Sequence, residues 1–201
     1  MDKEIIFETL VDSASKSGIQ CFLVDAIHSN NQKYFEIAAR NVKDINLKLT
    51  NKNNEKHPAL VLATQYNRAK MVEFLLDLPN IDVNRGYPLC DAQDSSIECV
   101  KLLLTDERTN VNQNVERDPP LVFAAMNNQA EVLKLLMEQP SIELNEISGN
   151  GHNALTIACD HSSIEAVNLL VANSKVNVNC SVARRTPLVL ATMRNCPENV
   201  E

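Results

Sequence analysis

The chain has 201 residues, of which 44% are hydrophobic, 22% are charged and only 4% are aromatic, and its formal net charge is −7. This composition is ordinary for a soluble, ordered protein, and no apolar run approaches the ~18 residues that cross a membrane. Basic and acidic residues balance in residues 1–57, so residues 58–201 carry the whole negative excess, which repels phosphate backbones and anionic lipid. We therefore expect no nucleic acid and no membrane among the partners.

The first element expected along the chain is an amphipathic helix at Glu4–Ser15. Its apolar residues have the spacing of a single helix face: Phe7, Leu10, Val11 and Ala14. A stack of repeats needs a terminal element that shields its first unit. We therefore expect a capping helix within residues 1–18, and a partner-binding helix is the alternative.

From residue 19 onward one pattern recurs: a short helix with a Leu-x-x-Ala anchor, a polar break, and a more apolar second helix. The anchors are Leu23/Ala26, Leu60/Ala63, Leu89/Ala92, Leu121/Ala124, Leu155/Ala158 and Leu188/Ala191. Their leucines are 37, 29, 32, 34 and 33 residues apart. Recurrence with a period of about 33 residues is typical of stacked helix pairs rather than of one compact domain.

The pattern predicts repeats near 19–47, 58–84, 85–112, 113–145 and 146–179, and a partial repeat at 180–201. The second helices are expected at Tyr34–Ala39, Met71–Leu76, Cys99–Leu104, Val132–Met137 and Ala166–Val171. An exit of the form hydrophobic-x-hydrophobic-Asn follows, as at Ile142–Asn145. We expect the polar segment Leu47–Pro58 to be a long, mobile finger between repeats. The pattern stops one turn into a second helix at Glu201, so we expect the natural chain to continue.

Three segments come close to the signature of a known repeat: Thr186-Pro187-Leu188 with Ala191, Tyr87-Pro88-Leu89 with Ala92, and Ile81-Asp82-Val83-Asn84. Together with the recurrences, they resemble the ankyrin repeat over roughly Cys21 to the end of the chain. The resemblance implies an all-α, right-handed solenoid of five helix-turn-helix repeats and a partial sixth. One departure is consistent, because the family's His after the anchor Leu is Val, Cys or Thr in this chain.

The resemblance also implies a function, that of a non-catalytic protein–protein interaction module that presents a rigid concave surface to a protein partner. Two alternatives stay open: an ankyrin-type enzyme inhibitor, and the N-terminal recognition fragment of a larger protein that carries an enzymatic domain. A single dominant stoichiometric partner would identify an inhibitor, and the sequence past residue 201 would identify a fragment. We expect a monomer.

The residue pattern predicts no catalytic group, cofactor or metal site. Asp160, His161 and the serines that follow them are neighbours at one helix end and point in different directions, so they do not form a triad. The six cysteines include no Cys-x-x-Cys pair. We interpret them as small buried residues in a reducing compartment, which favours an intracellular and cytoplasmic protein.

A partner is expected on the concave side, where positions five and six after the anchor Leu lie in ankyrin-like repeats. Tyr66 and Met126 are expected to anchor it, since Tyr and Met are enriched in interface cores. Packing of Met126 and Met193 against the following helix is the alternative. Glu73 and Lys134 are expected on the convex back. The partner-binding residues expected are His57, Gln65, Tyr66, Glu116, Asp118, Met126, Asn127, Asn150, His152, Asp160, His161, Arg185, Met193 and Arg194.

Overall fold

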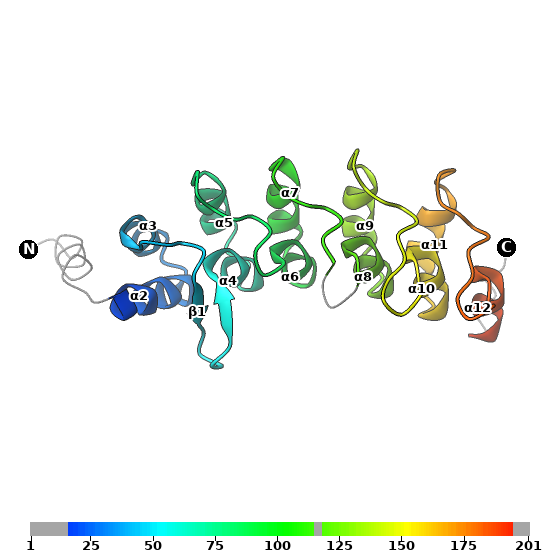
Figure 1. The fold of residues 1–201 in the computed structure, drawn as a ribbon, viewed down its shortest axis with the longest axis horizontal. Helices are drawn as coiled ribbons and strands as arrows, with labels where there is room; N and C mark the ends of the chain where they lie inside the picture. The colour runs from blue at the N-terminus through cyan, green and yellow to red at the C-terminus, as the bar shows by residue number, and fades with distance from the viewer. Residues whose placement is uncertain (1–15, 115–117, 195–201) are drawn as a thin grey trace, which may run out of the picture. The chain divides into compact units, whose positions relative to one another are not determined.

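The computed structural model describes residues 16–114 and 118–194 of the chain. The expected helix at Glu4–Ser15 and the expected partner-binding residue Glu116 lie outside these ranges. The described elements are α2 (Lys16–Ser29), α3 (Gln32–Asn41), β1 (Lys48–Thr50), β2 (Lys56–Pro58), α4 (Ala59–Gln65), α5 (Ala69–Leu76), α6 (Pro88–Ser95), α7 (Ile97–Thr105), α8 (Pro120–Met126), α9 (Ala130–Met137), α10 (Ala154–Asp160), α11 (Ile164–Val171) and α12 (Pro187–Met193). Every anchor lies in the first described helix of its repeat, and every predicted second helix lies in the next helix along the chain (Figure 1), so the helical repeat fold is confirmed.

The chain forms two compact units, residues 1–109 and residues 110–201. In the first unit α4 packs between α2 and α6, and α5 packs between α3 and α7. In the second unit α10 packs between α8 and α12, and α9 packs against α11. We call α2, α4 and α6, or α8, α10 and α12, the first-helix row of each unit, and the remaining helices its second-helix row. The apolar stripes meet between the rows, where Phe35, Leu75, Leu133 and Leu155 are fully buried.

The turn between the two helices of a pair explains the Leu-x-x-Ala anchor. In the repeat of α8 and α9, Asn128 takes the left-handed conformation (φ 52°), and the Gln129 N–H donates to Ala124 O at 2.9 Å. The same bond recurs from Asn31 to Ala26, from Arg68 to Ala63 and from Ser163 to Ala158. The anchor alanine thus supplies the carbonyl at which a left-handed helix end closes.

Asparagines at the ends of four exit segments join one repeat to the next. Asn112 donates from Nδ2 to Ser141 O (2.8 Å) and accepts at Oδ1 from the Glu143 N–H (3.0 Å), 29 and 31 residues further along the chain. Corresponding bonds to the following exit segment are made by Asn46, Asn84 and Asn145. We call these side chains the asparagine ladder. The recurring exit motif is therefore explained by its structural role.

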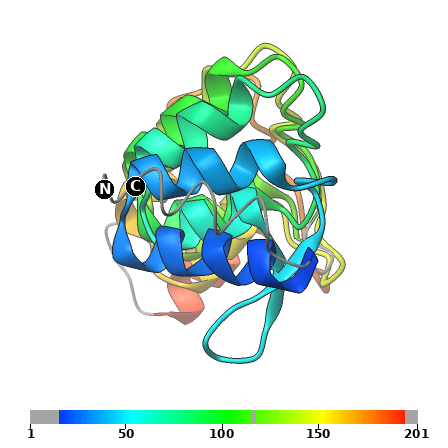
Figure 2. The same cartoon turned by 90° about the vertical axis from the view of Figure 1, so that its left-hand side faces the viewer.

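The segment expected as a long, mobile finger is an antiparallel hairpin of β1 and β2. Side-chain Oδ1 of Asn51 closes its tip by accepting from the N–H groups of Asn53 (3.0 Å) and Glu55 (2.9 Å). Leu49 is buried, and β1 packs against α2. The hairpin, which we call the hairpin finger (residues 48–58), projects from the helices of the first unit (Figure 2). The contacts of Leu49 and Asn51 hold its base and its tip.

Candidate functional site

Tyr66, an expected anchor, is the C-cap residue of α4 and lies on the first-helix row of the first unit. Its ring meets the ring of His28, near the end of α2, edge to face, with the centroids 4.4 Å apart. Arg68 fixes this corner by donating from Nε to Ile27 O (2.8 Å) and from Nη2 to His28 O (3.1 Å). Its positive charge also offsets the negative end of the α2 dipole. Tyr66 is therefore a half-buried ring held in place by a neighbouring repeat.

The burial of His28 predicts a pH-dependent stability. The pKa of His28 lies below its ordinary value of 6.5 because burial disfavours the imidazolium, and the ammonium of Lys52 and the guanidinium of Arg68 lower it further against the opposing effect of Asp25. The unfolded chain therefore takes up the proton at a higher pH than the folded chain does. We expect the folded state to lose stability as the pH falls below 6.5, until the folded-state pKa is passed.

Denaturant unfolding of the wild type and of His28→Gln between pH 7.5 and pH 5 measures this contribution. The variant should show a weaker loss of unfolding free energy in acid than the wild type. His161→Gln, which makes the same substitution at an exposed position, is the control for loss of an imidazole. The expectation would be contradicted if the unfolding free energy fell equally steeply with falling pH in all three proteins.

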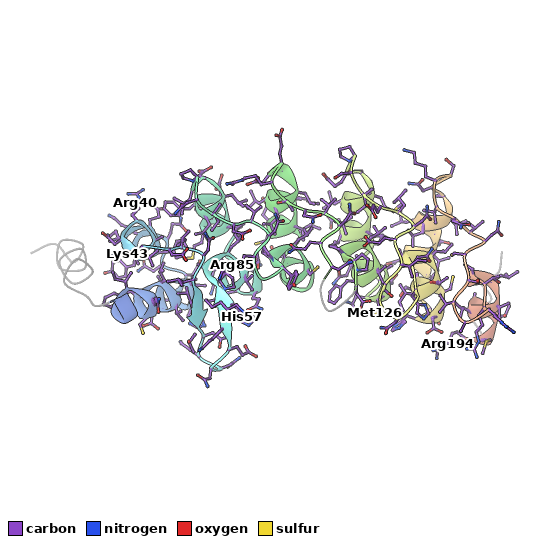
Figure 3. All side chains as sticks on the ribbon, viewed as in Figure 1. Arg40, Lys43, His57, Arg85, Met126 and Arg194 are labelled. Atoms are coloured by element: carbon purple, nitrogen blue, oxygen red, sulfur yellow. The ribbon has the colours of Figure 1, made fainter. Side chains whose placement is uncertain are left out.

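The other two residues expected in the first unit lie beside this corner in the chain. Gln65 is the last residue of α4 and is half-buried. His57 lies on β2 of the hairpin finger, paired with Leu49, and its Nε2 is 4.0 Å from Glu55 Oε2 (Figure 3). The candidate surface of the first unit therefore has two parts, the end of α4 and the hairpin finger that leads into α4.

In the second unit two expected residues, Asp160 and Arg194, bind each other. Arg194 is the C-cap residue of α12, and its Nε and Nη2 donate to the carboxylate of Asp160 at the end of α10, each contact being 3.2 Å. The ion pair joins two adjacent members of the first-helix row. Because the guanidinium side chain is 55% exposed, the pair contributes no more than about 1 kcal/mol to stability. Both charges are compensated within the chain, which sequence spacing did not reveal.

The two methionines of this row differ in exposure. Met126, at the end of α8, is half-buried, whereas Met193, at the end of α12, is 57% exposed. Figure 3 shows Met126 on α8 and Arg194 just after α12. The packing alternative therefore fits Met126 better than Met193. Beside them in the chain, Asn127 and His161 are exposed.

The remaining expected residues belong to the loops that enter the first helices of the second unit. Asp118 and His152 are half-buried, and Asn150 and Arg185 are exposed. Nδ1 of His152 is buried without a hydrogen-bond partner among the described residues. Two of these four side chains are therefore exposed to solvent.

Sequence reasoning missed Ile147, which is 64% exposed in the loop before α10. It borders a cavity of about 230 Å³ that Cys180 and Val182 of the next loop also line. Asn153 spans the two loops, because its Nδ2 donates to Cys180 Sγ at 3.1 Å. The available signal was an isoleucine two residues after the exit asparagine, where the neighbouring repeats carry polar Asn114 and Ser181.

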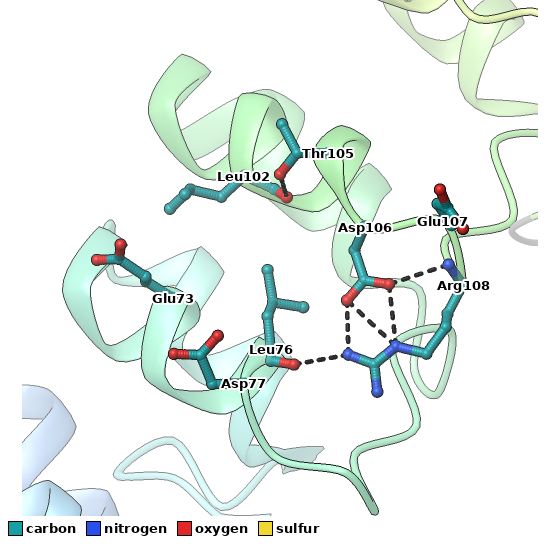
Figure 4. Close-up of a pocket in the computed structure, with 8 residues that line it drawn as sticks. All are labelled: Glu73, Leu76, Asp77, Leu102, Thr105, Asp106, Glu107 and Arg108. Atoms are coloured by element: carbon teal, nitrogen blue, oxygen red, sulfur yellow. Dashed lines mark hydrogen bonds and ion pairs between the residues drawn. The ribbon is translucent and has the colours of Figure 1, made fainter.

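A larger cavity of about 600 Å³ lies on the second-helix row of the first unit, between the C-terminal ends of α5 and α7 (Figure 4). Arg108 crosses it, donating from Nη2 to Leu76 O (2.6 Å) and to Asp106 Oδ2 (2.6 Å). The hydrogen bonds between Arg108 and the Asp106 carboxylate lower the pKa of Asp106 and raise that of Arg108. The other charged groups around the cavity are the carboxylates of Glu73, Asp77 and Glu107. Arg108 thus holds an exit segment onto the end of α5.

The described cysteines are thiols, and they are not uniformly buried. Cys21 is exposed and Cys180 is half-buried, so the expectation of buried cysteines is wrong for these two. Burial raises the pKa of Cys159 to about 11 and raises that of Cys99, which keeps both protonated near neutral pH.

Within residues 16–114 and 118–194, His, Cys, Asp and Glu side chains form no group of three that could hold a metal ion. None of the described helices is long and apolar enough to span a bilayer.

Comparison with known proteins agrees with the repeat pattern. The family model for ankyrin repeats, in three copies, matches residues 121–201. The human transient receptor potential cation channel subfamily A member 1 is 33% identical over 95 residues, which are 47% of this chain. Alpha-latrocrustotoxin-Lt1a of Latrodectus tredecimguttatus is 29% identical over 109 residues, or 52% of this chain. Each alignment covers only 8% of the relative's own length.

Solved structures show the same fold. The ankyrin repeat domain of Bcl-3, a member of the IkappaB protein family, has a TM-score of 0.74 at 21% identity, over 89% of this chain and 80% of that domain. An ankyrin repeat domain from Acinetobacter baumannii AYE has a TM-score of 0.75 at 19% identity, over 89% of this chain and 93% of that one. The described chain therefore has the ankyrin-repeat fold, and its residues 121–201 match the family model for ankyrin repeats.

Proposed function

We propose that this chain is a non-catalytic protein-interaction module, monomeric and intracellular, which binds protein partners at its first-helix rows and the adjacent loops. The observation that carries the proposal is the exposure of large apolar side chains at these places in the second unit. Met193 is 57% exposed at the end of α12, and Ile147 is 64% exposed in the loop before α10. Apolar groups of this kind stabilise a complex when a partner covers them.

The scaffold that carries these side chains is held by many regular contacts. Left-handed helix ends close the pairs α2/α3, α4/α5, α8/α9 and α10/α11, and the asparagine ladder joins consecutive exit segments. A surface ordered before binding loses little conformational entropy on association. The fold therefore favours recognition by presentation of a preformed surface.

The residues that superficially resemble catalytic groups have other roles. The carboxylate of Asp160 binds Arg194 on the neighbouring repeat. Ser163 Oγ donates to Met126 O (3.3 Å). Both groups are engaged in joining repeats, which supports a non-catalytic function.

Photo-crosslinking from the first-helix and second-helix rows tests the proposal. A benzoylphenylalanine is placed singly at Gln65 or Met193, and in matched control proteins at Glu73 or Lys134 of the second-helix rows. Lysate of the source cell should give protein crosslinks at the first two positions and none at the controls. Met193→Ala should then weaken binding of the captured partner about thirtyfold, since truncating an interface anchor can cost about 2 kcal/mol.

Tyr66 is tested with its own control, because its ring also packs on His28. Tyr66→Phe keeps the ring contact and Tyr66→Ala removes it, and circular dichroism reports whether each variant is folded. Partners that bind the row should be weakened by Tyr66→Ala in a folded protein. Crosslinks that arise only from Glu73 or Lys134 would place the partner on the opposite row and refute the proposal.

A further inference from the structure

The hairpin finger carries a concentration of positive charge in a chain whose net charge is −7. Lys48, Lys52 and Lys56 are all exposed, and none of their ammonium groups has a hydrogen-bond or ion-pair partner among the described residues. Glu55 is the single carboxylate of residues 45–58. Its Oε2 accepts from Asn51 Nδ2 at 2.8 Å, so this carboxylate is already engaged in closing the tip.

The register of the hairpin places two of these lysines on one face. Lys48 pairs with Pro58 and Thr50 pairs with Lys56, while Leu49 and His57 form the pair between them. Side chains of paired residues share a face, and successive residues alternate between faces. Leu49 is 2% exposed, whereas Lys48, Thr50 and Lys56 are exposed. The face of Leu49 is therefore anchored in the protein, and the other face presents Lys48 and Lys56 to solvent although Pro58, at its base, is buried.

From this placement we propose that the hairpin finger is a docking site for an extended acidic segment of a partner protein. Lys48 and Lys56 are diagonal neighbours on the hairpin, a separation of about 7–8 Å between residues and somewhat less between Cβ atoms. Alternate side chains of an extended peptide are about 7 Å apart, since each residue advances the strand by about 3.3 Å. Carboxylates at every second position of such a segment match the spacing of the two lysines. The proposal rests on the proposed function, because it names the partner chemistry for one part of that surface.

Two features favour a short acidic peptide over other anions. The hydrogen bonds of Asn51 and the buried Leu49 hold the finger in one conformation, which lowers the entropy lost on binding. A long polyanion, such as nucleic acid or an anionic membrane, would extend past the finger over a chain with seven excess negative charges. A short segment gains the attraction of the lysines without that repulsion. The tip also reaches toward the first-helix row, since Lys52 is near enough to His28 to lower its pKa.

The test is a titration of labelled (Glu-Ser)4 and (Gln-Ser)4 peptides, a twelve-residue oligothymidylate and phosphatidylserine vesicles onto three folded proteins. These are the wild type, the finger variant Lys48→Gln/Lys52→Gln/Lys56→Gln, and the control Lys70→Gln/Lys134→Gln/Lys175→Gln, which loses the same net charge elsewhere. The wild type should bind the glutamate peptide and not the glutamine peptide. The finger variant should bind it about tenfold more weakly, and the control within about twofold, since each exposed ion pair adds a small increment.

Several results would overturn the proposal: no binding of the glutamate peptide, equal weakening in both triple variants, or tighter binding of the oligonucleotide or vesicles at physiological salt. Lysines on a short sheet edge can also keep copies of a protein apart. Self-association of the finger variant without any peptide binding by the wild type would assign the lysines that role instead. A partner crosslinked at Gln65 that binds the finger variant as it binds the wild type would refute only this inference and leave the proposed function standing.

Discussion

Replacing Gly86 by Ala should lower the free energy of unfolding by about 2–4 kcal/mol, the sum of a left-handed backbone penalty and a steric clash in a packed region. Gly86 has φ +79°, and a Cβ at this position would lie 2.9 Å from Pro58 Cδ and 3.1 Å from Val61 Cγ2. Both neighbours are buried, so they have little room to move. Gly86 is where the short loop before α6 crosses the base of the hairpin finger.

Gly151→Ala is the matched control for the Gly86 substitution. Gly151 has nearly the same backbone conformation (φ +83°), but the nearest atom to an added Cβ is Val182 Cγ1 at 3.8 Å. Only the backbone penalty remains, so we expect a loss of about 1–2 kcal/mol. Urea unfolding followed by circular dichroism compares the two variants. Equal losses at both positions would show that the contact with Pro58 has no energetic weight.

The second prediction concerns the asparagine ladder. Asn112→Ala should lower the free energy of unfolding by about 1–3 kcal/mol, since it removes two hydrogen bonds of about 0.5–1.5 kcal/mol each. The two bonds, to Ser141 O and from the Glu143 N–H, hold the exit segments of consecutive repeats together. Amide hydrogen exchange should therefore quicken at Glu143 in the variant, because that N–H loses its acceptor.

Asn179→Ala is the control for the ladder prediction. Asn179 has the same place in the exit motif, but its side chain makes no hydrogen bond within the described part of the chain. A surface substitution of this kind changes stability by less than about 0.5 kcal/mol. If Asn179→Ala costs as much as Asn112→Ala, the ladder bonds do not explain the recurring asparagine.

Local patterns in the sequence determined the helices of this protein. The Leu-x-x-Ala anchors and the apolar second segments predicted every helix pair from α2/α3 to α10/α11, because a helix that buries one stripe must repeat apolar residues at helical spacing. The polar break with Asn128 likewise predicted a turn, since asparagine tolerates the left-handed conformation that closes the helix end. These features depend on residues within a few positions of one another.

The contacts of the candidate site were predicted less completely, because they join residues that lie far apart along the chain. Position in the repeat identified Tyr66, Asp160 and Arg194 as residues at the ends of first helices, and the structure places them there. Position did not reveal that Asp160 binds Arg194, 34 residues further along the chain. Nor did it reveal that Tyr66 packs on His28, since the partner lies in another repeat.

The repeating apolar pattern predicted the helical repeat fold, the helix pairs and the exit asparagines. The packing of the repeats sets which groups those asparagines bond, which residues pair in the hairpin finger, and which of the expected partner-binding side chains remain exposed. The two kinds of feature differ in how far apart the interacting residues lie along the chain. Helical spacing is encoded within one turn of chain, whereas the contacts that bury a ring or pair a charge join repeats about 30 residues apart, and only stacking brings them together.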